Sequence, residues 1–285
     1  MNKENKPKIL LLGGEGFIGR NLANYLAKSF ECLSVGAVRS LFLAREDTFI
    51  ASDPYADTLA YETDVVIHLI DNKRCQGEEF LNEEKKLVEN IALNKSKHLV
   101  LFSSAVVYAN PDSEYGVRKQ QLETFYTEYC QENNVPLTIV RLFNTFGAFQ
   151  LPYRQGSLVA NLIYNHLNAI PTEIQDLSAQ RDFLYAGDIP KFIELFIKEK
   201  ITGTYDLGSG KLTSLEEVVT MLQEQTEGEP LNIINKNIPE LFATQSANNQ
   251  FLDTIALTPM PESLRETINF FSNNRAILQT YVAKK

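Results

Sequence analysis

The stretch "ILLLGGEGFIGRNL" joins an apolar run to an amphipathic segment through a glycine-rich turn. Glycine permits a tight turn, lets a ligand approach the backbone, and lets a helix pack closely on the preceding strand. The first N–H groups of the helix then face an anionic group such as a pyrophosphate. A connection with no ligand is the plainer alternative, but a glycine turn placed between strand and helix favours a dinucleotide site. Its predicted residues are Gly13, Gly16, Phe17, Ile18 and Gly19.

Short apolar runs alternate with longer amphipathic segments through the first two thirds of the chain. "KILLLGG", "DVVIHLI" and "HLVLFSS" indicate strands, while "EEFLNEEKKLVENIAL" and "YGVRKQQLETFYTEYCQEN" indicate helices. Apolar strands that alternate with helices predict an α/β fold with a doubly wound parallel sheet of Rossmann type. The alternation loosens after Asn144, and the remaining helices and short strands predict a lobe packed on that sheet.

The composition excludes some functions. Among 285 residues there are 27 Lys and Arg against 36 Asp and Glu, a formal net charge of −9. This balance argues against a nucleic-acid-binding protein, which needs a basic face. No apolar run of about 20 residues predicts a membrane span, and the charged start "MNKENKPK" does not predict a signal peptide. The three scattered cysteines have no metal-binding spacing, so we expect a cytoplasmic protein without a metal site.

The second strand carries information about the cofactor. An Asp or Glu about 20 residues beyond the glycines usually holds the adenosine ribose of NAD. The stretch "CLSVGAVRS" has no acid there and contains Arg39 instead. An arginine can pair with a 2′-phosphate, which favours NADP over NAD; the alternative is that Arg39 is a solvated loop charge.

The stretch "VLFSSAVVYANPDSEYGVRK" holds the candidate catalytic residues Ser104, Tyr115 and Lys119. Ser104 ends a predicted central strand, where parallel sheets place ligands. Tyr115 and Lys119 share a helix face, because residues four apart are neighbours. An ammonium near the phenol should lower its pKa, so that Tyr115 could exchange a proton with a sugar oxygen while a nicotinamide exchanges hydride. An ordinary surface pair is the alternative for Tyr115 and Lys119 alone.

Six motifs, "GGEGFIG", "FSSAVVY", "YGVRKQQLE", "RLFNTFG", "RDFLYAGDI" and "YDLGSG", together resemble the extended short-chain dehydrogenase/reductase family of nucleotide-sugar epimerases and dehydratases. The resemblance implies an NAD(P)-binding Rossmann domain over residues 1–145, to which later segments return. It implies that residues 146–285 form mainly a smaller C-terminal substrate-binding lobe. The implied substrate is a sugar linked to a nucleoside diphosphate.

The resemblance also assigns roles to single residues. Ser104, Tyr115 and Lys119 match the family's catalytic set, and Ser103, Tyr115 and Lys119 are expected to contact the cofactor. Asn144 in "RLFN" and Arg181 in "RDFLY" match residues that hold the substrate diphosphate. An ion pair with Asp182 or Asp188 is the alternative for Arg181. Family members often form homodimers through helices that here correspond to Glu78–Asn94 and Tyr115–Asn133.

The residues after Ser104 argue against two of the reactions that the family catalyses. Family 4,6-dehydratases place an Asp–Glu pair there and decarboxylases a glutamate, whereas this chain has Ala105 and Val106. With dehydration and decarboxylation set aside, the expected reaction is hydride transfer at C4 of the sugar. The short segment between Ser104 and Tyr115, with Arg39, favours a 4-ketoreductase; a 4-epimerase with retained NAD is the alternative. A non-catalytic dinucleotide-binding regulator is the alternative of another class, and the unusual Ile70–Asp71 segment beside the predicted cofactor site speaks for it.

Overall fold

The computed structural model describes residues 6–36, 41–42, 49–59, 61–154, 156–226, 230–239 and 245–284. The chain divides into two compact units. The first comprises Met1–Leu142 and Pro190–Asp206, and the second comprises Phe143–Ile189 and Leu207–Lys285.

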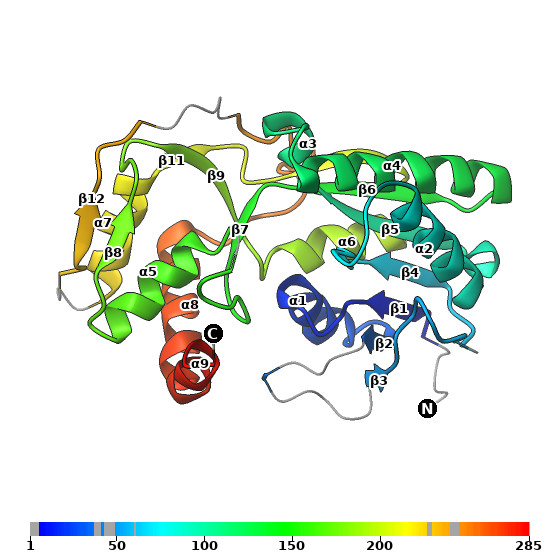
Figure 1. The fold of residues 1–285 in the computed structure, drawn as a ribbon, viewed down its shortest axis with the longest axis horizontal. Coiled ribbons are helices and arrows are strands. Elements are labelled where there is room, and N and C mark those ends of the chain that lie inside the picture. Colours follow the sequence, from blue (N-terminus) through cyan, green and yellow to red (C-terminus); the bar gives the residue numbers. More distant parts are fainter. Residues whose placement is uncertain are drawn as a thin grey trace. The chain divides into compact units, whose positions relative to one another are not determined.

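A seven-stranded sheet organises the first unit (Figure 1). Its strands are β1 (Lys8–Leu12), β2 (Glu31–Gly36), β3 (Phe49–Ala51), β4 (Val65–His68), β5 (His98–Ser104), β6 (Leu137–Leu142) and β10 (Gly203–Leu207). They lie in the order β10-β6-β5-β4-β1-β2-β3. The β1–β2, β1–β4, β2–β3, β4–β5 and β5–β6 pairs are all parallel. This is the strand order of a dinucleotide-binding sheet. From β1 the strands β2 and β3 are added on one side and the strands from β4 onward on the other. Sheets of this kind bind ligands at the point between β1 and β4 where the order reverses. The predicted α/β fold of Rossmann type is confirmed.

Helices cover both faces of this sheet. They are α1 (Phe17–Leu26), α2 (Gly77–Asn90), the 3₁₀ turn η2 (Leu93–Lys95), α3 (Val106–Ala109), α4 (Glu114–Asn133) and α6 (Ile189–Lys198). On one face, α2 and α4 pack Phe80, Leu87 and Leu122 against Leu10 and Leu101 of the sheet. On the other face α1 and α6 are neighbours, because Ser29 just after α1 donates to Glu194 of α6 at 2.8 Å. Among the described helices, none combines the length and apolar character that a membrane span requires.

In its described residues, the second unit has two small sheets and four helices. The strands are β7 (Asn144–Phe146), β8 (Thr172–Ile174), β9 (Gln180–Tyr185), β11 (Leu212–Ser214) and β12 (Ile233–Asn235). One sheet has the order β11-β9-β7 and the other pairs β12 with β8. The helices are α5 (Leu158–Leu167), α7 (Leu215–Gln225), α8 (Met260–Asn273) and α9 (Arg275–Val282). Ser214 and Glu217 form a capping box that starts α7 directly after β11.

The single apolar run "PLTIVRLFN" forms two strands, not one. β6 ends at Leu142 and β7 begins at Asn144, and the buried Phe143 between them donates its N–H to the carbonyl of Leu207 at 3.0 Å. The chain passes from the first unit to the second at this residue. Buried apolar residues continue across the break, with Phe143 before β7 and Phe146 at its end, so the sequence pattern alone does not reveal it.

A buried carboxylate on β9 joins three segments of the second unit. Asp182 is 0% exposed and accepts hydrogen bonds from Ser209 N at 2.6 Å, Ser209 Oγ at 2.7 Å, Gly210 N at 3.0 Å and Ala247 N at 2.8 Å. A charged acceptor satisfies three backbone donors that would otherwise be buried without partners. Asp182 therefore holds the "GSG" turn and the segment around Ala247 on the sheet.

We expect Asp182→Asn to lower the free energy of unfolding by about 2–3 kcal/mol, because an amide cannot accept hydrogen bonds on both sides. Urea denaturation followed by circular dichroism measures the loss. Asp253→Asn, at an exposed position of the same unit, is the control and should change stability by less than about 0.5 kcal/mol. Equal stability of the two variants would contradict this account of Asp182.

Candidate active site

The glycine turn between β1 and α1 is closely packed. Gly13 has a φ of +81°, and its N–H donates to the carbonyl of Val35 at 2.9 Å. A Cβ added at Gly19 would lie 2.5 Å from both the Gly13 oxygen and the Gly14 Cα. Only glycine fits at Gly19, because backbone atoms surround it on that side. The turn and the helix start are therefore drawn together, as the sequence predicts for a pyrophosphate cradle.

The start of α1 is suited to an anion. Gly16 precedes the helix in an extended conformation and supplies no side-chain cap, and the first turn contains no acidic residue. Phe17 and Ile18 are the first two helical residues, so their N–H groups lack intrahelical partners. The one nearby carboxylate in the turn, Glu15, is paired with Arg20 at 2.8 Å. These residues fit the diphosphate of a dinucleotide.

The predicted preference for NADP depends on Arg39, which follows β2 in the sequence. β2 ends at Gly36, and Arg39 lies outside the described residues. The preference for NADP therefore stays a prediction from the sequence.

The three candidate catalytic residues meet at the carboxyl end of β5. Ser104 is the last residue of β5, and Tyr115 is the second residue of α4. The two side chains share a hydrogen bond. Lys119 lies one helical turn further on, with its Nζ 5.7 Å from the centroid of the Tyr115 ring. The structure thus brings Ser104, Tyr115 and Lys119 together.

Local packing sets the position of Tyr115. Ser113 caps α4 by accepting the N–H of Gly116 at 3.1 Å, which fixes where the helix begins. A Cβ at Gly116 would lie 2.3 Å from the carbonyl oxygen of Asn110. Gly116 therefore lets the short segment after Ser104 pack against the first turn of α4, and this contact keeps Tyr115 close to Ser104.

The pKa of Tyr115 differs from the sequence-based expectation. Burial raises it above the ordinary value, and the charge of Asp71 acts in the same direction. The hydrogen bond with Ser104 and the charge of Arg118 lower it, but they do not offset burial. Lys119 directs its ammonium to the carbonyl oxygen of Phe102 at 3.0 Å, not to the phenol. The predicted fall of the Tyr115 pKa below its ordinary value is therefore wrong for the protein without ligands, because desolvation dominates.

The Ile70–Asp71 segment after β4 borders both parts of the site. The side chain of Ile70 packs against the glycine turn, 3.2 Å from where a Cβ of Gly13 would stand. Asp71 is paired with Arg118 of α4, with Oδ1 3.2 Å from Nε. Its charge is therefore balanced by an arginine next to Tyr115, which the sequence did not suggest.

Ser103 faces away from Ser104, since successive residues of a strand point to opposite faces. Its hydroxyl donates to Glu123 at 2.5 Å, and Glu123 also accepts from Nε of Arg141 at 2.9 Å. Arg141 donates in turn to the hydroxyl of Tyr108, which donates to Asp206 at 3.1 Å. The Ser103 hydroxyl is hydrogen-bonded within this network. The predicted contact of Ser103 with a cofactor would therefore involve its backbone atoms.

The two predicted substrate residues lie in the second unit. Asn144 begins β7 opposite Phe183 of β9, and its amide donates to the carbonyl of Asp182 at 3.5 Å. Arg181 is half-buried on β9, and its Nη1 donates to the carbonyl of Gln180 at 2.7 Å. Register and strand alternation place Asn144, Arg181 and Phe183 on one face of the small sheet.

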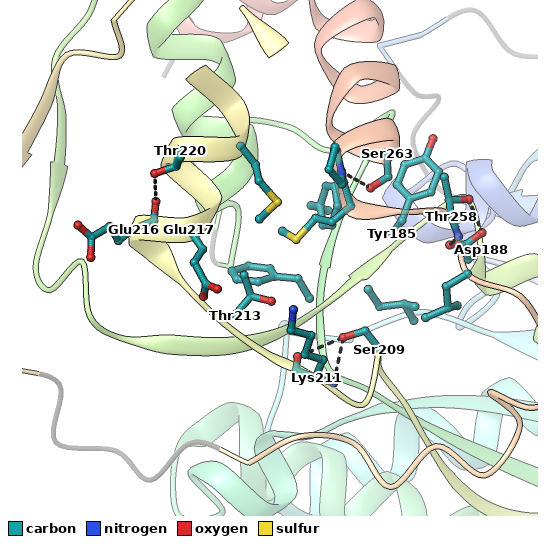
Figure 2. Close-up of a pocket in the computed structure, with 17 residues that line it drawn as sticks. Tyr185, Asp188, Ser209, Lys211, Thr213, Glu216, Glu217, Thr220, Thr258 and Ser263 are labelled. Carbon is teal, nitrogen blue, oxygen red and sulfur yellow. Dashed lines mark hydrogen bonds between the residues drawn. The ribbon is translucent and has the colours of Figure 1, made fainter. Parts of the chain in front are cut away.

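The same unit contains a cavity of about 680 Å³ between β7, β9, β11, α7 and α8 (Figure 2). Phe146, Phe183, Met221 and Met260 form apolar parts of its wall. Figure 2 shows Lys211 and Ser209 at one side of the cavity, and Tyr185, Asp188 and Thr258 at another. Its size and mixed lining are those of small-molecule sites. The motif "RDFLYAGDI" and the stretch that follows "YDLGSG" contain several of these residues, but the sequence did not show that they share a cavity.

Comparison with known proteins agrees with this architecture. Residues 9–208 match the NAD dependent epimerase/dehydratase family. The chain belongs to this family. The resemblance carried by the glycine turn, the Tyr/Lys helix and the later motifs is thereby confirmed, and NAD dependence is the family's general property.

Individual family members show how varied the relatives are. The UDP-2-acetamido-2,6-beta-L-arabino-hexul-4-ose reductase of Pseudomonas aeruginosa is 27% identical over 205 residues, which is 70% of this chain and 52% of that protein. This chain thus matches about half the length of that reductase. The UDP-N-acetylglucosamine 4-epimerase of Methanobrevibacter ruminantium has a TM-score of 0.79 at 21% identity, covering 95% of this chain and 99% of that one. The UDP-glucose 4-epimerase of Thermus thermophilus, solved with NAD, has a TM-score of 0.77 at 19% identity, covering 93% and 99%. The two structures show the fold.

Proposed function

We propose that this chain is an NAD(P)-dependent oxidoreductase that transfers hydride at C4 of a nucleoside-diphosphate sugar, as a 4-ketoreductase. The hydrogen-bonded Ser104–Tyr115 pair, with Lys119 buried beside it, carries the proposal. The first unit binds the dinucleotide at its glycine turn, and the second unit binds the nucleotide sugar.

Each residue of the set has one task. A reduced nicotinamide held at the glycine turn would supply the hydride for the carbonyl carbon. Tyr115 donates its phenolic proton to the carbonyl oxygen, and Ser104 hydrogen-bonds the same oxygen and holds it in line. Lys119 places a positive charge beside the phenolate that forms, so it stabilises the product of proton transfer.

The raised pKa of Tyr115 supports reduction as the working direction. A phenol is protonated at neutral pH, and burial raises the pKa of Tyr115 further. A proton donor must be protonated before it acts. Oxidation of an alcohol requires the opposite state, a phenolate ready to accept a proton. The ligand-free site is therefore prepared for a ketone substrate.

Two features of the second unit support the substrate class. Arg181 presents a guanidinium, the group best matched to a diphosphate, on the same sheet face as Asn144. The cavity next to this face is large enough for part of a nucleotide sugar. The relative from Pseudomonas aeruginosa, a hexul-4-ose reductase by name, agrees with the reaction.

Incubation with a panel of nucleotide sugars and 4-keto nucleotide sugars tests the proposal. NADPH or NADH oxidation is followed by absorbance, and the products are identified by NMR. Stoichiometric oxidation of the cofactor with a 4-keto sugar identifies a reductase. Inversion at C4 without net cofactor consumption identifies the alternative, a 4-epimerase. Dinucleotide binding without turnover of any substrate would favour a regulator and contradict both enzyme assignments.

The cofactor preference has its own test. If Arg39 pairs with the 2′-phosphate, Arg39→Ala should weaken NADP binding by about 10-fold to 100-fold, the equivalent of one charged hydrogen-bonding contact, and leave NAD affinity unchanged. Isothermal titration calorimetry with both dinucleotides measures the ratio. An unchanged ratio would remove Arg39 from the cofactor site.

We also propose a homodimer formed through α2 and α4. The family resemblance supports this proposal, because members often dimerise through the helices that correspond here to α2 and α4. Light scattering of the purified chain gives the mass that decides between monomer and dimer. The cytoplasmic location stays a prediction.

A further inference from the structure

Arg141 lies near the end of β6, opposite Ser103 of the neighbouring strand β5. Its guanidinium forms an ion pair with Glu123 of α4, in which Nε donates to Oε1 at 2.9 Å and Nη2 donates to Oε2 at 2.5 Å. The Arg141 and Glu123 side chains are 23% and 12% exposed. A two-point contact between arginine and carboxylate fixes orientation as well as distance. Arg141 therefore holds α4 at a defined position on the sheet.

The same guanidinium also holds α3. Its Nη1 donates to the hydroxyl of Tyr108, and its central carbon lies 4.9 Å from the centroid of the Tyr108 ring. The Tyr108 hydroxyl donates in turn to Asp206 of β10 at 3.1 Å. Because Tyr108 is 41% exposed, its position depends more on these hydrogen bonds than on apolar packing. The rigid fork of arginine thus joins one helix through a carboxylate and another through a phenol.

The helix α3 is in direct contact with Ser104. The backbone N–H of Val106, the first residue of α3, donates to Oγ of Ser104 at 3.2 Å. This bond occupies an acceptor site of the hydroxyl, which also shares a hydrogen bond with Tyr115. α3 has four residues, too few to form a stable helix by itself. The orientation of Ser104 therefore depends on the contacts that hold Tyr108.

The helix α4 carries the other member of the catalytic pair. Tyr115 precedes Glu123 by eight residues on α4, which is about two helical turns. A helix holds a side chain more precisely than a loop does, provided that the helix itself is fixed. Ser103 of β5 also donates to Glu123 at 2.5 Å. The position of Tyr115 on the sheet therefore depends on the contacts that hold Glu123.

We propose that Arg141 is a positioning residue for proton transfer, because it holds together the two helices on which Ser104 and Tyr115 depend. Every residue of this network belongs to the first unit. The alternative is an ion pair that stabilises the fold and does not affect how Ser104 meets Tyr115. The importance of Arg141 for catalysis rests on the proposed function, whereas its effect on the geometry of the pair does not.

NMR of the full chain without ligands tests this geometry. The tyrosines are labelled with ¹³C at Cζ, the carbon that bears the hydroxyl, and the Tyr115 signal is assigned by its loss in Tyr115→Phe. Arg141→Lys keeps the charge beside Glu123, but an ammonium has no planar fork to bind a carboxylate and a phenol together. Tyr108→Phe keeps the ring and removes only its hydroxyl. We expect both variants to move or broaden the Tyr115 signal, although neither changes the net charge.

The matched control is Arg74→Lys. Arg74 pairs with Asp53 at 2.6 Å in the same unit, and its side chain is 66% exposed. The same substitution there should leave the Tyr115 signal unchanged. A wild-type Tyr115 signal in folded Arg141→Lys and Tyr108→Phe would overturn the proposal. If Arg141→Lys does not fold, Tyr108→Phe decides, because it alters one exposed hydroxyl.

With a substrate in hand, kinetics adds a functional readout. Misplacing a reacting group by about 1 Å costs about 100-fold in rate. We therefore expect Arg141→Lys and Tyr108→Phe to lower kcat by about 10-fold or more at nearly constant KM, at a temperature where both remain folded. Arg74→Lys should keep kcat within about twofold. Wild-type kcat in both network variants would overturn the catalytic role of Arg141. A wild-type chain that turns over no nucleotide sugar would instead contradict the proposed function, and the NMR result would stand.

Discussion

Replacing Tyr115 with phenylalanine is expected to lower kcat on the true nucleotide-sugar substrate by about 100-fold to 10,000-fold, the usual contribution of a positioned proton donor. The ring remains and only the hydroxyl that hydrogen-bonds Ser104 is lost. Substrate binding should change little, because the sugar oxygen keeps its hydrogen bond with Ser104. Steady-state kinetics at saturating cofactor measures the effect as a loss of kcat at nearly constant KM.

The pH dependence of the wild-type enzyme also tests the role of Tyr115 as a proton donor. Reduction requires the protonated phenol, and burial raises the pKa of Tyr115. Activity should therefore persist to higher pH than an ordinary tyrosine would permit, and fall only as pH rises through the raised value. Tyr129→Phe on the same helix is the matched control and should keep turnover within about twofold. Full activity in Tyr115→Phe would remove Tyr115 from the reaction.

Adding a single methyl group at Gly19 should have the largest effect on the cofactor site. In Gly19→Ala the new Cβ would lie 2.5 Å from the Gly13 oxygen and from the Gly14 Cα. Because both are backbone atoms, the turn itself must move, and overpacking of this kind lowers stability by about 1–3 kcal/mol. The displaced N–H groups lose at least two charge-assisted hydrogen bonds to the pyrophosphate at about 1.5 kcal/mol each. Dinucleotide affinity should thus fall by about 100-fold or more.

Fluorescence titration with NADH and NADPH measures this loss, and thermal unfolding without ligand reports how far the turn itself is destabilised. Gly77→Ala is the matched control, because a Cβ there meets nothing within 4 Å. Alanine at Gly77 is strained by the positive φ of that residue, which is not the case at Gly19, and the control should nevertheless bind dinucleotide like the wild type. Wild-type affinity in Gly19→Ala would show that the cradle does not hold the cofactor.

The parts of the fold that depend on local pattern were predictable. The run "HLVLFSS" coincides with β5, His98–Ser104, because a central parallel strand is apolar on both faces. The helix that carries Tyr115 and Lys119 was equally clear, since the predicted stretch "YGVRKQQLETFYTEYCQEN" lies entirely within α4, Glu114–Asn133. The glycine turn was predictable because strand, glycine spacing and helix occur together in one short stretch.

The parts that depend on distant partners were not predictable. Glu84 stands in "NEEKKLVEN" among other charged residues, and its burial follows only from Tyr55, His68 and Tyr126 closing around it. Ser103 was predicted to contact a cofactor, and the hydrogen bond of its hydroxyl to Glu123 of α4 was not foreseen. The split between β6 and β7 likewise follows from Phe143 bonding to Leu207, a residue far along the chain.

The sequence by itself determined the order of strands and helices, the glycine cradle and the residues that can exchange a proton. These depend on spacing along the chain and on the conformational limits of single residue types, which are local. Only the tertiary structure decided the charge states. Whether Tyr115 holds its proton and Lys119 its charge depends on how much water is removed and which charges remain near, and folding alone brings those groups together.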